Sequence, residues 1–167
     1  MSHVLSKPLI PAGHRAVGAI VTVALMACAS GVPTRDDVAA IQLAAASEML
    51  SGILSNPGSI EAVCVGYGGD WEDPELPPVG ARDPAITYPD LSYMDGCVDI
   101  EGRLVAREGG GQAISVSVGA PELTGDEEAA VTVYTSTGSI DVAVYRCAVR
   151  DLGGSWRAER CEMGATS

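Results

Sequence analysis

The chain has 167 residues, of which 22 are acidic and 10 are lysine or arginine, so its formal net charge at pH 7 is −12. This length suits one domain, and the negative charge excludes nucleic acid and anionic lipid headgroups as electrostatic partners. Both histidines and the only lysine, Lys7, precede Ala16. The rest of the chain therefore lacks the residues for Ser-His-Asp or Cys-His catalysis, Schiff-base chemistry, histidine metal sites and Walker-type phosphate loops. No cofactor and no metal are expected.

The first candidate element is a short apolar run near the N-terminus. Residues 16 to 30 read AVGAIVTVALMACAS and follow a stretch that contains Lys7 and Arg15 but no acid. A helix that spans a bilayer needs about 20 apolar residues, so this run is short for a membrane span. A basic stretch, a short apolar run and then small residues is the layout of a secretory signal peptide. We therefore expect residues 1–27 to be cleaved on export.

The end of this run has two interpretations. Leu25-Met26-Ala27-Cys28 resembles the lipobox of bacterial lipoproteins, although Met26 stands where a small residue is commoner. The resemblance implies that Cys28 is lipidated, becomes the first mature residue and anchors the protein to a bacterial membrane, on its periplasmic or cell-surface side. The alternative is cleavage after Ala29 by ordinary signal peptidase, because Ala27-Cys28-Ala29 is also a small-x-small site. That cleavage would release a soluble domain without Cys28.

Cysteine counting favours the lipoprotein interpretation. The five cysteines are Cys28, Cys64, Cys97, Cys147 and Cys161. Without Cys28 an even set of four remains, which in an oxidising compartment predicts two disulfides. A zinc site would need short paired spacings such as Cys-x-x-Cys, and none occurs. Because Cys147 and Cys161 flank the last predicted hairpin, we expect them to pair, which leaves Cys64 with Cys97.

The mature domain is expected to begin with one amphipathic helix. After a tether at residues 28–35, Thr34 is a suitable N-cap and acidic residues in the next turn complement the helix dipole. Apolar residues then recur with helical spacing, at Val38, Ile41, Ala45, Met49 and Ile53. The sequence Asn56-Pro57-Gly58 ends the pattern. The helix is predicted over Asp36–Leu54.

The rest of the chain is predicted to form strands and turns. The expected strands are Ile60–Tyr67, Val98–Arg107, Ile114–Val118, Val131–Thr135, Ile140–Val149 and Trp156–Cys161, with a loop at Gly119–Glu128. A helix followed by an antiparallel meander of five or six strands gives an α+β domain over residues 36–164, with a tail at 165–167. Cystatin-like and NTF2-like folds have the same order of elements, which is an analogy of architecture only.

The segment Tyr67–Gly96 is the most irregular part of the domain. Its five prolines prevent regular structure, and structureless segments of this length tend to be functional or disordered. It carries Trp71, Tyr88 and Tyr93, and such side chains are favoured in recognition surfaces. One interpretation is an exposed binding surface formed by these three aromatics. The other is that the segment lies across the sheet and its aromatics complete a core that contains no Phe.

We therefore expect a lipid-anchored bacterial envelope protein with a small, acidic domain stapled by two disulfides. Its role is expected to be binding or structural rather than enzymatic, with an envelope protein or polysaccharide as ligand and the membrane as partner through the lipid on Cys28. Two alternatives remain open. One is a soluble secreted domain cleaved after Ala29. The other is a hydrolase of an envelope polymer that relies on carboxylates, the groups left for acid–base chemistry.

Overall fold

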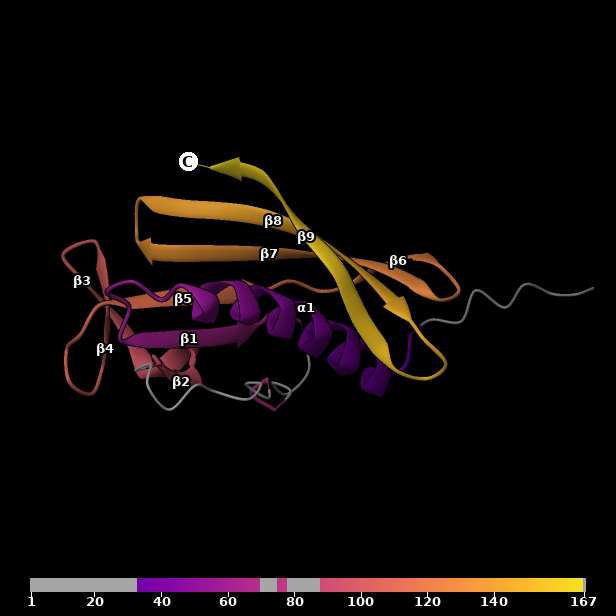
Figure 1. The fold of residues 1–167 in the computed structure, drawn as a ribbon, viewed down its shortest axis with the longest axis horizontal. Coiled ribbons are helices and arrows are strands. Elements are labelled where there is room, and N and C mark those ends of the chain that lie inside the picture. The colour runs from indigo at the N-terminus through magenta and orange to yellow at the C-terminus, as the bar shows by residue number, and fades with distance from the viewer. Residues whose placement is uncertain (1–32, 70–74, 78–87, 167) are drawn as a thin grey trace, which may run out of the picture.

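The structure is a computed structural model, which describes residues 33–69, 75–77 and 88–166 (Figure 1). The predicted leader, Cys28 and Trp71 lie outside these residues. The elements are α1 (Arg35–Ser55), β1 (Ala62–Tyr67), β2 (Asp90–Tyr93), a 3-10 turn η1 (Met94–Gly96), β3 (Cys97–Ile100), β4 (Arg103–Ala106), β5 (Ala113–Val118), β6 (Glu122–Gly125), β7 (Glu128–Gly138), β8 (Asp141–Asp151) and β9 (Trp156–Thr166).

The N-terminus of α1 has the predicted N-cap, Thr34, which forms a capping box with Asp37. The Thr34 hydroxyl accepts a hydrogen bond from the Asp37 amide at 3.2 Å and donates one to the Asp37 carboxylate at 2.7 Å. The Thr34 amide donates to the same carboxylate at 3.1 Å. These hydrogen bonds satisfy amides that an uncapped helix would leave without partners. They also hold the pKa of Asp37 below its ordinary value, with a further contribution from a hydrogen bond with Trp156.

This capping box predicts a pH-dependent contribution to stability. Because the pKa of Asp37 is lower in the folded state, its contribution is present above the unfolded pKa of about 4 and is lost as the pH falls through the folded pKa. Asp37→Asn should therefore lower the melting temperature at pH 7 and have a smaller effect at pH 3. Asp36→Asn, in the same turn, is the matched control. A loss that is equal at both pH values would contradict this role.

The α+β class is confirmed, with one N-terminal helix packed on a mostly antiparallel sheet. The main sheet has seven strands in the order β2-β1-β5-β7-β8-β9, with β6 paired to β7 at the side of this path, and β3 and β4 form a separate two-stranded sheet. The sheet is thus larger than the five or six strands expected. The strand β9 extends to Thr166, which pairs with Ala143, so residues 165 and 166 belong to the sheet and not to a tail.

Only part of the sheet is the predicted meander. Strands β7, β8 and β9 follow one another with antiparallel pairing. Strand β1, in contrast, is parallel to both of its neighbours, with Ala62 opposite Asp90 of β2 and Ala113 of β5. Parallel neighbours need a crossover of a dozen or more residues. The irregular segment after Tyr67 provides the crossover from β1 to β2.

The helix covers one face of the sheet and forms the main core there (Figure 1). Its buried side chains include Ile41, Ala45 and Leu50, and they meet valines of β1, β5 and β7. Alternate residues of β1 face the other side of the sheet. There Ala62 and Cys64 form a second, smaller cluster with Ala113 of β5 and Cys97 of β3.

The predicted strand Val98–Arg107 is wrong, because the chain turns back at Glu101 and Gly102. Both residues have positive φ, 53° and 80°, as both central residues of a type I′ hairpin turn do. The Gly102 amide also donates to Asp99 Oδ1 at 2.8 Å. The result is the hairpin of β3 and β4, with Ile100 opposite Arg103. The predicted loop Gly119–Glu128 likewise contains the short strand β6.

Both predicted disulfides are present. Cys64 of β1 is bonded to Cys97 of β3, and Cys147 of β8 is bonded to Cys161 of β9. Cys147 and Cys161 are direct partners in the β8–β9 register, so this bond joins neighbouring strands. The Cys64–Cys97 bond instead ties the β3–β4 hairpin to the face of β1 that lies away from the helix.

Candidate functional site

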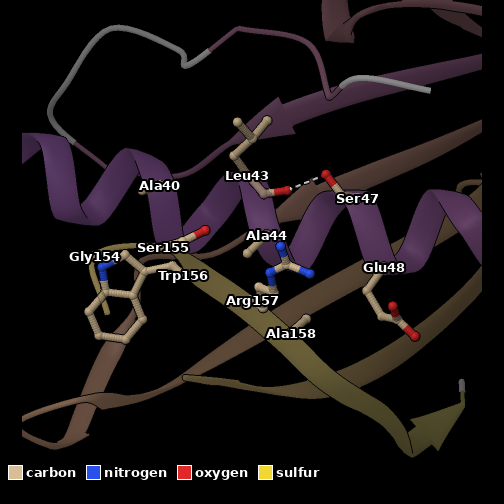
Figure 2. Close-up of a pocket in the computed structure, with 10 residues that line it drawn as sticks. All are labelled: Ala40, Leu43, Ala44, Ser47, Glu48, Gly154, Ser155, Trp156, Arg157 and Ala158. Atoms are coloured by element: carbon tan, nitrogen blue, oxygen red, sulfur yellow. Dashed lines mark hydrogen bonds between the residues drawn. The ribbon is translucent and has the colours of Figure 1, made fainter. Parts of the chain in front are cut away.

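One hollow in the described part of the chain lies between the outer side of α1 and the start of β9 (Figure 2). It has a volume of about 650 Å³ and is lined by Ala40, Leu43, Ala44, Ser47, Glu48 and the segment Gly154–Ala158. Trp156 and Glu48 lie at opposite ends of this group of side chains (Figure 2). Trp156 and Ala158 also pack against the main core. The wall of the hollow therefore combines small aliphatic side chains and Trp156 with one carboxylate, the exposed Glu48, and one cation, Arg157.

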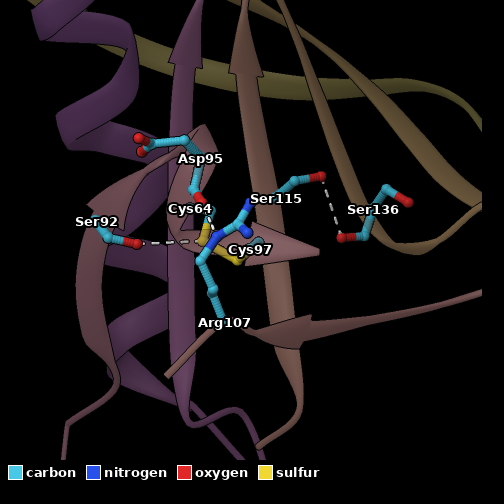
Figure 3. The surroundings of a disulfide bond; sticks show 7 residues. All are labelled: Cys64, Ser92, Asp95, Cys97, Arg107, Ser115 and Ser136. Carbon is cyan, nitrogen blue, oxygen red and sulfur yellow. Dashed lines mark hydrogen bonds between the residues drawn. A yellow bond between two sulfur atoms is a disulfide. The ribbon is translucent and has the colours of Figure 1, made fainter. Parts of the chain in front are cut away.

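The second hollow, of about 410 Å³, lies beside the Cys64–Cys97 disulfide (Figure 3). Its lining includes Ser92, Asp95 and Arg107. The Ser92 hydroxyl lies 3.2 Å from Cys64 Sγ, and the Arg107 Nε donates to the main-chain oxygen of Asp95 at 2.7 Å. A Cβ atom at Gly96 would overlap the Ser92 hydroxyl, so glycine is required for this close approach. The wall is thus held together by a disulfide and by hydrogen bonds.

The structure does not bring the predicted aromatic surface together as a unit. Tyr88 is partly buried and packs against the main core, which is the anchoring role considered as the alternative interpretation. Tyr93, at the end of β2, has 38% of its surface exposed. Trp71 lies outside the described residues. A binding surface that includes all three residues therefore stays a prediction.

One buried polar residue was missed by the sequence analysis. Gln42 on α1 is fully buried, and its side-chain amide donates to the main-chain oxygens of Gly68 at 2.9 Å and Gly119 at 3.1 Å. These two glycines directly follow β1 and β5. Gln42 therefore joins the helix to the ends of two parallel strands. A glutamine among apolar helix residues was the available signal, since a polar group at such a position needs hydrogen-bond partners.

Ion pairs cover the strands β6 to β9. Arg146 pairs with Glu122 at 3.0 Å, Arg150 with Glu128 at 2.7 Å and Glu159 at 3.2 Å, and Arg160 with Glu162 at 3.2 Å. All of these side chains are substantially exposed, so each pair contributes little to stability. In these pairs three arginines offset most of the charge of four glutamates.

Two further findings concern membranes and metals. Helix α1 is long and apolar enough to cross a membrane by length and composition, with a mean hydropathy of 1.4. Its apolar side chains are packed on the sheet, as those of a core helix are. Within the described part of the chain, no three His, Cys, Asp or Glu residues are grouped so that they could hold a metal ion.

The chain matches no family model, no curated protein and no solved structure, so its function has to be inferred from its own residues.

Proposed function

We propose that this protein is exported and anchored to a bacterial membrane by a lipid on Cys28, and that its domain has a binding or structural role. The observation that carries the proposal is the use of cysteines. The two disulfides account for all four cysteines after Cys28. Disulfides of this kind are typical of exported proteins, and an odd cysteine in such a protein calls for its own explanation. Lipidation at the lipobox-like sequence provides that explanation.

The position of α1 supports a short connection to the membrane. Six residues, Cys28 to Pro33, separate the proposed lipid from the capping residue Thr34. Fully extended, six residues span at most about 20 Å. A domain held this closely would remain at the membrane surface, with the N-terminal end of α1 nearest to the lipid.

The carboxylate-dependent hydrolase receives less support. Such an enzyme needs a carboxyl group whose surroundings keep it protonated at working pH, usually through burial. The carboxylates that line the two hollows are Glu48, Asp90, Asp95 and Glu108, and all four are exposed. The soluble secreted domain has the same fold as the anchored one, so only the fate of Cys28 separates these two proposals.

The anchoring proposal is tested with Cys28→Ser, expressed in a bacterial host that processes lipoproteins. The wild type is expected in the membrane fraction, with a mature N-terminus at Cys28 that carries acyl chains in mass spectrometry. Cys28→Ser should move the protein to the soluble fraction, whereas Ser30→Ala, two residues away, should leave it in the membrane. Recovery of an unmodified wild-type N-terminus at Ser30 would establish the soluble secreted form instead.

A further inference from the structure

The outer face of the β3–β4 hairpin carries three apolar side chains beside Arg103. In the hairpin register Cys97 lies opposite Ala106 and Val98 lies opposite Val105. Side chains alternate between the two faces of a strand pair. Cys97, Leu104 and Ala106 pack into the cluster beside β1, so Val98, Ile100 and Val105 lie on the opposite face of the hairpin. The alternating apolar residues before and after the turn therefore lie on opposite faces of the hairpin. Val98 and Ile100 lie on the outer face, and Leu104 and Ala106 lie on the inner face.

The turn that joins β7 to β8 also carries an exposed isoleucine, and it touches the β3–β4 turn. The tip of the β7–β8 hairpin is Ser139–Ile140, and the Ser139 amide donates to the Gly102 oxygen at 3.3 Å. A Cβ atom at Gly138 would overlap that same oxygen, so the two turns touch through their main chains. Ile140 is 86% exposed and Ile100 is 54% exposed. Turns favour Gly, Asn, Asp and Ser, so turn formation does not account for an exposed isoleucine at a hairpin tip.

The charge around these residues is predominantly negative. Exposed acids outnumber cations on the two turns, with Asp99, Glu101 and Asp141 against Arg103. In the register Asp99 lies opposite Leu104 on the inner face, whereas Arg103 lies opposite Ile100 on the outer face. No described residue forms an ion pair with Arg103, and the lining of the second hollow adds three carboxylates and one further cation, Arg107. This differs from β6 to β9, where four glutamates form ion pairs with three arginines. The two turns therefore combine exposed aliphatic surface with uncompensated acid.

The hairpin tips lie at the end of the molecule remote from the start of α1. Helix α1 lies along the long axis, and the β3–β4 and β7–β8 turns lie towards its C-terminal end (Figure 1). A helix of 21 residues is about 31 Å long, which exceeds the reach of about 20 Å for the six-residue tether. On the proposed anchoring, these turns point away from the membrane.

We propose that Val98, Ile100, Val105 and Ile140 form a docking surface for a basic peptide segment that carries aliphatic side chains, as part of another envelope protein. The aliphatic side chains would cover the hairpin face, and the basic ones would meet the surrounding carboxylates. A second copy of this chain is disfavoured because it would bring two acidic surfaces together. The membrane is disfavoured because its anionic headgroups are repelled as well. Only the direction of the surface rests on the proposed anchoring, since docking itself does not require Cys28.

The experiment uses the exported chain with Cys28→Ser, isotope-labelled for NMR, and two synthetic peptides as probes. One peptide alternates lysine and leucine, and the other alternates glutamate and leucine. We expect the lysine–leucine peptide alone to bind, with shift changes concentrated at Val98, Ile100, Val105 and Ile140. Replacing Ile100 and Ile140 together by Thr should weaken binding by about tenfold or more, because each side chain loses apolar area that docking would bury. Added salt should weaken it further.

Leu152→Thr is the matched control, because Leu152 is 59% exposed on the β8–β9 turn at the other end of the molecule. It should leave the affinity unchanged, and all variants should melt within a few degrees of the parent. A lysine–serine peptide that binds as well as the lysine–leucine peptide would show that charge alone accounts for binding, and this result would overturn the proposal. Equal binding by the Ile100 and Ile140 double variant would also overturn it. So would the same shift changes produced by raising the protein concentration or by adding phosphatidylglycerol vesicles.

Discussion

Replacing Cys64 and Cys97 together by Ala is expected to lower the free energy of unfolding by about 4 kcal/mol, the largest effect among the changes considered. The bond closes a loop with a sequence separation of 33. In the chain-entropy model, removing it raises the conformational entropy of the unfolded chain, which stabilises the unfolded state by about 4 kcal/mol. The bond also joins the β3–β4 hairpin to β1, so the hairpin would lose its covalent link to the sheet. The melting temperature should fall by about 10–15 °C.

The matched comparison is replacement of Cys147 and Cys161 by Ala. That bond closes a loop with a separation of only 14 between strands that are already paired, and its expected cost is about 3 kcal/mol. Denaturant unfolding of both variants measures the two costs directly. If the Cys147–Cys161 variant proves the less stable of the two, then loop entropy does not govern these bonds and native packing around Cys147 does.

Gln42→Leu is expected to destabilise the domain by about 1–3 kcal/mol, although leucine fits a buried helix position. The reason is the loss of two hydrogen bonds from one side chain, which leaves the Gly68 and Gly119 oxygens without this donor. Ser47→Ala is the control on the same helix, because the Ser47 hydroxyl bonds only to Leu43 within α1. A Gln42→Leu variant as stable as the wild type would show that solvent replaces the lost donor.

A charged residue at position 42 provides a second test of these hydrogen bonds. Gln42→Glu would place a carboxylate against two main-chain oxygens in a fully buried site. Burial would raise the pKa of the introduced carboxyl group above its unfolded value, since only the protonated form can donate a hydrogen bond there. Its destabilisation is therefore expected at pH 7 and should decrease as the pH falls towards about 4.3. Melting curves at several pH values measure this change, which Gln42→Leu should not show.

The features that could be predicted from the sequence are the local ones. Thr34 directly precedes α1 and acidic residues follow in the first turn, so these neighbours were sufficient to predict the start of the helix, although not the capping box with Asp37. Cys147 and Cys161 were paired correctly because they flank one hairpin. In each case the partners are close along the chain, and the turn or cap between them is of a common type.

The features that could not be predicted depend on partners far along the chain. Gln42 meets oxygens 26 and 77 residues away, and nothing local to α1 reveals them. The parallel pairing of β1 with β5 is equally remote, because apolar runs carry no information on strand direction. The β3–β4 turn was missed for another reason. Its sequence is Glu-Gly, whereas Asn-Gly and Asp-Gly are the usual type I′ turns, and the alternating pattern continues through it.

The order of strands has a consequence for the chain during its synthesis. Helix α1 is made first, but the strand it contacts most, β9, is made last, and β7 and β8 come only shortly before it. Domains form from the N-terminus as the chain grows, and surface that waits for its partner is prone to aggregate. The part of this apolar helix that β9 covers must therefore remain exposed until almost the whole domain has been made. Premature termination before β9 would leave that part exposed, so the final strand completes the cover of the first helix.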